Sequence, residues 1–121
     1  MPSVTLPFPP STLSAHAKGN DRWKKIEQTK EFRALAAKEA RKLDWPDFGD
    51  HKAYTTEGDI ALRIIFVPPT KQGDRVNFPA RAKPLLDGIA DALKVNDARF
   101  VPQYQFNAPE KPGRVTVEVL G

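Results

Sequence analysis

The strongest hydrophobic pattern in the chain is an almost wholly apolar run over residues 59–67. A strand that is apolar on both alternating faces is typical of the centre of a sheet. Pro68 and Pro69 end this strand, and a polar loop over residues 70–73 leads to Asp74. The pattern therefore predicts a central strand with Asp74 just beyond its end, where a rigid scaffold can present a side chain to a ligand.

Two further segments have a helical period. The first is capped by Asn20 or Asp21 and runs to about residue 43, and the second lies between about residues 79 and 93 and contains Pro84. The apolar positions of each helix share one face, so both helices should pack on a sheet. The residues expected in the core are Ile26, Phe32, Ala36, Ala40 and Leu43 in the first helix and Leu86, Ile89, Ala90 and Leu93 in the second.

Three shorter strands complete the predicted layout. Residues 4–8 have a short alternating pattern before a pair of prolines, and residues 101–106 and 114–120 form an expected hairpin. The order β-α-β-α-β-β predicts an α+β fold in which two helices pack on one mixed β-sheet of about four strands. We expect the whole chain of 121 residues to form one domain.

The composition limits the chemistry that the protein can perform. The chain contains no cysteine and only two histidines, His16 and His51, so thiolate and histidine-based zinc sites are excluded. Any bound metal should be a hard ion with oxygen ligands. No apolar run approaches the roughly 20 residues of a spanning helix. Residues 1–10 lack the features of a signal peptide, and we therefore expect a cytoplasmic protein with no membrane partner.

The net charge of +4 and the pI of about 9.5 favour a polyanionic partner without identifying it. The positive charge is concentrated in residues 18–42, which hold nine Lys or Arg against four Asp or Glu. One face of the first helix could therefore bind a nucleic-acid backbone. A solvated helix with ordinary charge pairs explains the same residues, and the sequence leaves both interpretations open.

The most specific chemistry lies after the central strand, where four aspartates within 24 residues are interleaved with cations. Carboxylates are suitable ligands for a divalent cation, and Lys or Arg can contact phosphates. The sequence therefore predicts a divalent-cation site that faces a phosphate backbone. The acidic residues are Asp74, Asp87, Asp91 and Asp97, and the cationic residues are Arg75, Arg81 and Lys83.

Several short motifs occur in a recognisable order. The chain contains Leu6-Pro7-Phe8-Pro9-Pro10-Ser11, an Asp-x-x-Asn element that ends at Asn77, Lys83 followed by Leu86-Asp87-Gly88, and Asn96-Asp97. In this order the motifs resemble those of the RusA-type Holliday junction resolvases of bacteria and prophages, and the resemblance covers nearly the whole chain. It implies a RusA-like fold and a homodimeric, magnesium-dependent endonuclease, with manganese as an alternative ion. Such an enzyme cuts branched DNA, in particular four-way junctions, in recombination and repair.

The resemblance also assigns roles to individual residues. Aligned through Asn77, the family's first motif aspartate falls on Asp74 and its turn aspartate on Asp97. These two are the expected metal ligands and catalytic residues, with Asp87 or Asp91 in reserve. Lys83 is the expected catalytic cation, and the residues expected to contact DNA are Arg75, Asn77, Arg81, Lys83, His16, Lys18 and Asn20.

The chain departs from the family pattern at two positions. The second motif aspartate of the family falls on Val76, which cannot bind a cation, and Asn96 replaces the first acid of the family's turn. A magnesium ion needs only one or two protein carboxylates when water and phosphate oxygens complete its shell, so Asp74 and Asp97 could suffice. The alternative is a catalytically impaired relative that binds branched DNA without cutting it.

Each candidate also has a structural interpretation. Asp87 and Asp91 could lie on a solvated helix flank, paired with Lys83 and Lys94. In that case the two carboxylates would add little to a metal site.

The remaining positions have similar alternatives. Asp74 and Asp97 could shape turns, Asn77 could cap the second helix, and Val76 is most simply a buried residue. Trp23 falls off the apolar face of its helix, where it could stack on a base or, as we favour, pack on a neighbouring side chain.

Overall fold

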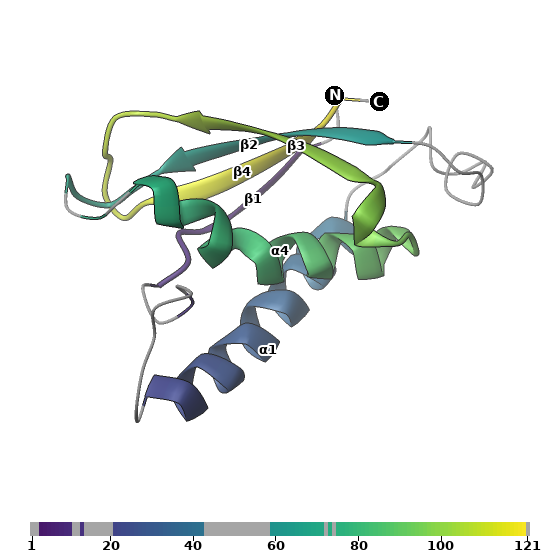
Figure 1. Cartoon of the computed structure of the whole chain (residues 1–121), viewed down its shortest axis with the longest axis horizontal. Helices are drawn as coiled ribbons and strands as arrows, with labels where there is room; N and C mark the ends of the chain where they lie inside the picture. The colour runs from purple at the N-terminus through teal and green to yellow at the C-terminus, as the bar shows by residue number, and fades with distance from the viewer. Residues whose placement is uncertain are drawn as a thin grey trace.

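The protein is an α+β structure in which two helices cover one face of a four-stranded mixed sheet (Figure 1). The computed structural model describes residues 3–10, 13, 21–42, 59–71, 73 and 75–120. Its main elements are β1 (Ser3–Pro7), α1 (Asp21–Arg41), β2 (Ile60–Val67), α4 (Phe78–Leu93), β3 (Phe100–Phe106) and β4 (Arg114–Val119). Two single-turn 3-10 helices, η2 (Arg75–Asn77) and η3 (Asp97–Arg99), flank α4. The architecture predicted from the sequence is confirmed.

The strand order is β1-β4-β2-β3. Strand β2 pairs in parallel with β3 and antiparallel with β4, while β1 pairs antiparallel with β4. Ile64 thus lies opposite Tyr104 on one side and Val117 on the other. The double-sided apolar pattern of β2 is explained by this central position, as the sequence predicted.

The expected hairpin between β3 and β4 is wrong, because β2 lies between these two strands. The connection over residues 107–113 is longer than the two to five residues typical of a hairpin loop, and it passes from one side of β2 to the other. Burial explains the choice of neighbours. Val115, Val117 and Val119 are all buried on β4, whereas on β3 only Phe100 is buried, so β3 occupies the edge.

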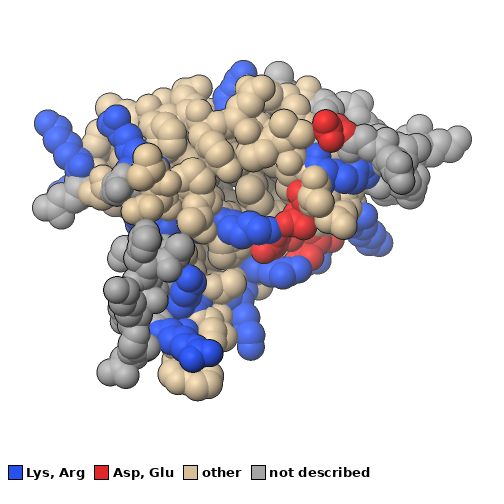
Figure 2. All heavy atoms as spheres, viewed as in Figure 1, with Lys and Arg blue, Asp and Glu red and all other residues tan. Residues whose placement is uncertain are grey.

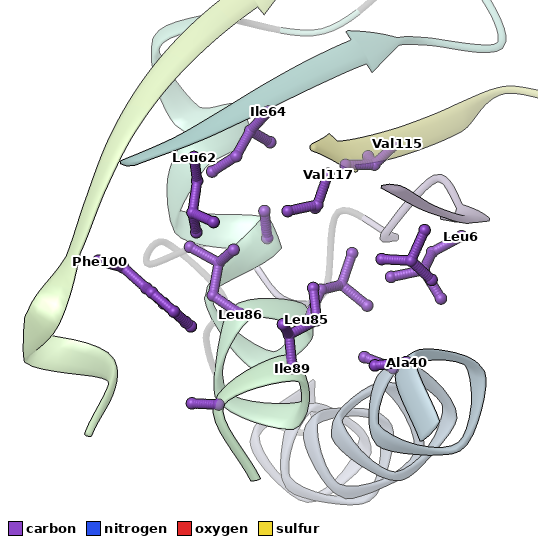
Figure 3. Packing of buried hydrophobic residues seen from close by; sticks show 14 of the residues in the cluster. Leu6, Ala40, Leu62, Ile64, Leu85, Leu86, Ile89, Phe100, Val115 and Val117 are labelled. Atoms are coloured by element: carbon purple, nitrogen blue, oxygen red, sulfur yellow. The ribbon is translucent and has the colours of Figure 1, made fainter. Parts of the chain in front are cut away.

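The core lies between the inner face of the sheet and α4 (Figure 3). Figure 3 shows side chains of β2 and β4 pointing toward Leu85, Leu86 and Ile89 of α4. Each of these side chains is more than nine-tenths buried, and full burial of one such side chain stabilises a fold by roughly 1.5–3 kcal/mol. The predicted core face of α4, which also includes Ala90 and Leu93, is confirmed.

The predicted core face of α1 is only partly confirmed. Ala36 and Ala40 are fully buried and Phe32 packs against the core, but Ile26 is 41% exposed. Figure 1 gives the reason: the N-terminal half of α1 projects away from the sheet and from α4. Leu43 lies outside the described residues.

The two helices cross at Gly88 of α4. A Cβ atom at this position would lie 2.2 Å from the carbonyl oxygen of Arg33 and 2.8 Å from Cβ of Ala36. Real Cβ atoms do not approach other atoms so closely, so only glycine allows the helices to meet at this distance. The crossing fixes Arg33 and the rest of the α1 face against the central turns of α4.

Replacement of Gly88 by alanine tests this close approach. Alanine inside a helix is ordinarily favoured over glycine by about 1 kcal/mol. Here the added methyl group should force the helices apart, and overpacking of this kind lowers the free energy of unfolding by roughly 1–3 kcal/mol. Denaturant unfolding monitored by circular dichroism measures the change.

A second variant provides the control. Because the closest atom is a backbone oxygen of Arg33, an added Ala36→Gly change should not restore the stability of Gly88→Ala. A Gly88→Ala protein as stable as wild type would show that the helix crossing is not constrained in this way.

Candidate functional site

Asp97 is brought back to the flank of α4 by a tight turn at the end of that helix. Lys94 ends α4 in the left-handed conformation, with φ of 58°, and the backbone N–H of Val95 donates to the carbonyl of Ala90 at 3.1 Å. Such an arrangement satisfies the last carbonyls of a helix and reverses the chain. The side chain of Asn96 then accepts a hydrogen bond from the N–H of Ala98 at 2.9 Å, which holds η3 and its first residue, Asp97.

Two carboxylates converge on the ammonium group of Lys83. Lys83 Nζ donates to Asp87 Oδ1 at 2.6 Å, one turn along α4, and also donates to Asp97 Oδ2. The hydrogen bonds that Lys83 donates to Asp87 and Asp97 raise the pKa of Lys83, and the bond that Asp97 accepts lowers the pKa of Asp97. The predicted pairing of Lys83 with Asp87 is confirmed, and the turn residue Asp97 joins the same cluster. We call Lys83, Asp87 and Asp97 the carboxylate cluster.

Asp91 lies on the same helix but has a different partner. Arg33 of α1 donates from Nε to Asp91 Oδ2 at 2.7 Å and from Nη2 to Asp91 Oδ1 at 2.9 Å. This bidentate pair lowers the pKa of Asp91 and raises the pKa of Arg33. The pairing of Asp91 with Lys94 that the sequence suggested is wrong. Lys94 ends the helix in the left-handed conformation, while the crossing at Gly88 brings Arg33 to the carboxylate of Asp91.

The guanidinium group of Arg81 makes its contacts within the protein. Its Nε and Nη2 donate to the carbonyl of Pro9 at 3.1 and 2.7 Å, and its guanidinium lies over the rings of Phe8 and Phe78. Burial lowers the pKa of Arg81. These contacts tie the segment after β1 to α4, and we therefore no longer assign a phosphate to Arg81.

The residues just before α4 do not have the capping and burial that the sequence suggested for Asn77 and Val76. Asn77 occupies the capping position of α4, but its side chain makes no capping hydrogen bond among the described residues. Val76 is 79% exposed, so its interpretation as a buried residue is wrong. The short helix η2 lies on the surface, and Arg75, at its start, is also exposed. The remaining candidates, Asp74, His16, Lys18 and Asn20, lie outside the described residues.

A groove of about 220 Å³ lies beside the carboxylate cluster, between α1 and α4. The groove is lined by Lys83 and Asp87 of α4, by Lys25 and Thr29 of α1, and by Leu13. Sequence analysis singled out neither Lys25 nor Thr29 individually, although both lie in the basic segment over residues 18–42. Their place in the groove depends on the helix crossing, which has no local sequence signal.

The charges on this face are unevenly distributed (Figure 2). Acidic side chains gather near the C-terminal half of α4, and Lys and Arg side chains surround them and continue along α1. Asp87 and Asp97, which share the ammonium group of Lys83 within this basic face, are chemically suited to bind a divalent ion together with a phosphate. Within the described residues no group of three or more His, Cys, Asp or Glu is close enough to hold a metal ion, so the cluster would supply two protein ligands. No described helix is long and apolar enough to cross a membrane.

The Lys83→Met variant should raise the pKa of Asp97. In wild type the pKa of Asp97 is lowered from its ordinary value of 3.8, so ionised Asp97 stabilises the folded protein at pH values above 3.8. This contribution is lost as the pH falls through the lowered pKa. Without the ammonium group, Asp97 faces Asp87 and its ionised form becomes less favourable. Carboxyl carbon NMR titration measures the pKa directly.

Arg33→Met is the matched control, because it removes one cation from the neighbouring pair. It should raise the pKa of Asp91 and leave that of Asp97 close to wild type. An Asp97 titration that is unchanged in Lys83→Met would contradict the ion cluster.

Comparison with known proteins places the chain in a family. No protein-family model matches the chain. The chain is 40% identical, over 124 aligned residues, to a protein of Xylella fastidiosa (strain Temecula1 / ATCC 700964) described as "Uncharacterized protein". The alignment covers 100% of this chain and 77% of that protein. The chain belongs to the same family as this Xylella fastidiosa protein.

Proposed function

We propose that this protein is a RusA-like, structure-specific endonuclease that cuts branched DNA by magnesium-dependent hydrolysis of phosphodiester bonds. The observation that carries the proposal is the convergence of Asp87 and Asp97 on Lys83 within a basic face. The order of motifs that resembles the RusA-type resolvases supports the same assignment. Action on DNA is consistent with a cytoplasmic protein.

The carboxylate cluster is suited to a magnesium ion. Asp87 and Asp97 would hold the ion, and Asp74, which the resemblance favours as a metal ligand, lies outside the described residues. Bound there, magnesium would orient the attacking water and neutralise charge on the scissile phosphate. The raised pKa of Lys83 keeps it protonated at neutral pH, so it serves as a fixed cation for developing negative charge and not as a general base.

The projecting half of α1 supplies a surface for a DNA arm. Arg22, Lys24 and Lys30 are exposed there, and they can contact phosphates without reading sequence. Trp23 is 76% exposed, so the packing interpretation that we favoured from the sequence is wrong and its ring is available for stacking on a base. Lys25 extends this basic surface to the groove beside the carboxylate cluster.

A homodimer fits the proposed substrate. A four-way junction has near two-fold symmetry and two of its strands must be cut, so a C2 dimer with one site in each protomer is the natural assembly. The edge strand β3 exposes Val101 and Tyr104, which are candidate residues for such a contact.

Cleavage of a labelled four-way junction, with and without magnesium, tests the proposal. Asp97→Asn and Asp87→Asn should each reduce the cleavage rate by roughly 1,000-fold, because metal stabilisation of the transition state is worth several kcal/mol and each 1.36 kcal/mol is tenfold in rate. Binding is recorded in the same samples, and it should not be weakened by removal of one negative charge. Glu110→Gln, which removes an exposed carboxylate paired with Arg114, is the matched control and should cut normally.

The outcomes separate the two candidate functions. Tight, salt-sensitive binding with no cleavage would identify the impaired relative that Val76 suggests, and Val76→Asp would then be tested for a gain of cleavage. Absence of both binding and cleavage by wild type would reject the nuclease and the binding module together.

A further inference from the structure

A second groove, of about 280 Å³, lies at the start of α4, where β2 and β3 end. Because these two strands are parallel, their carboxyl ends meet at one edge of the sheet. The groove is lined by Lys71, from the loop after β2, and by Arg75, from η2. Ala108 and Pro109, from the segment after β3, and Phe78 of α4 also line it.

The segment after β3 and the ring of Phe78, which line part of this groove, are held in place by contacts to the end of β2. The N–H of Asn107 donates to the carbonyl of Phe66 at 2.9 Å, and the N–H of Glu110 donates to the carbonyl of Pro68 at 2.8 Å. The ring of Phe78 packs against that of Phe66, with ring centroids 5.7 Å apart. This part of the groove is therefore ordered before any ligand enters it, which reduces the cost of binding.

The basic residues of the groove differ from those of the carboxylate cluster. Lys83 is already paired with carboxylates, whereas neither Lys71 nor Arg75 forms an ion pair with a described residue. Both side chains are exposed. Glu110, the acid that follows Pro109, is directed to Arg114 at 3.3 Å. Two cations beside an apolar wall are chemically suited to a phosphate with its attached nucleoside.

We propose that this groove binds a backbone phosphate of the DNA at a second point, separate from the carboxylate cluster. The inference rests on the proposed function. Phe78 and Asp87 are nine residues apart on α4, which corresponds to about 13.5 Å along the helix axis. A phosphate held in the groove is therefore a different phosphate from the one at the carboxylate cluster. Figure 2 shows Lys and Arg side chains at this end of the molecule, on the same face as the acidic cluster.

Fluorescence anisotropy of a labelled four-way junction, titrated without metal at several salt concentrations, tests the groove. Lys71→Ala and Arg75→Ala should each weaken binding several-fold and reduce the slope of log K against log salt by about 1, the value for one phosphate contact. Lys71→Arg keeps the charge and should retain the wild-type slope. Ala108→Glu, at the exposed rim, adds a negative charge and should weaken binding without removing any cation.

Lys111→Ala is the matched control, because it removes an exposed lysine that does not line the groove. It should retain the wild-type slope, and a thermal melt verifies that every variant is folded. Slopes equal to wild type in both Lys71→Ala and Arg75→Ala would overturn the groove proposal even if wild type cuts the junction. Reduced slopes in a protein that does not cut would support the groove and reject the nuclease. A wild-type protein that does not bind the junction would overturn both.

Discussion

The close crossing of α1 and α4 at Gly88 determines how the candidate functional face is assembled. Because no side chain separates the helices there, Arg33 lies within reach of Asp91 and the α1 side of the groove faces Lys83 and Asp87. Neither helix carries this arrangement alone. The local sequence of α4 places its acids and Lys83 on one flank, but Arg33, the cation that pairs with Asp91, comes from a helix more than 50 residues earlier in the chain.

The carboxylate cluster is stable because its negative charges share one internal cation. Two carboxylates on one ammonium group would repel each other, and Lys83 offsets that repulsion while the side chains stay partly accessible to solvent. Under the proposed function, a divalent ion between Asp87 and Asp97 would take over this role. The ammonium group of Lys83 would then be available to a phosphate.

Local patterns predicted those features that depend on a few neighbouring residues. The two apolar faces of β2, the buried face of α4 and the pair between Lys83 and Asp87 all follow from strand or helix periodicity. The failures depend on tertiary arrangement. The order of β3 and β4 was set by which strand could be buried on its inner face, and the partner of Asp91 was set by the helix crossing. Val76 looked apolar and therefore buried, but a short surface turn exposes it.

The position of β4 has a consequence for synthesis of the protein. β4 is the last of the described strands in sequence, yet it lies between β1 and β2 and pairs with both. While the chain emerges from the ribosome, β1 has no neighbouring strand among the elements described here until residues 114–119 appear. The two helices and the parallel pair of β2 and β3 can form earlier, but the inner face of β2 stays open on one side. Nascent chains of this protein therefore expose an unpaired strand edge of β2 until residues 114–119 have been made, and such an edge is a site for misassembly that a chaperone would have to cover.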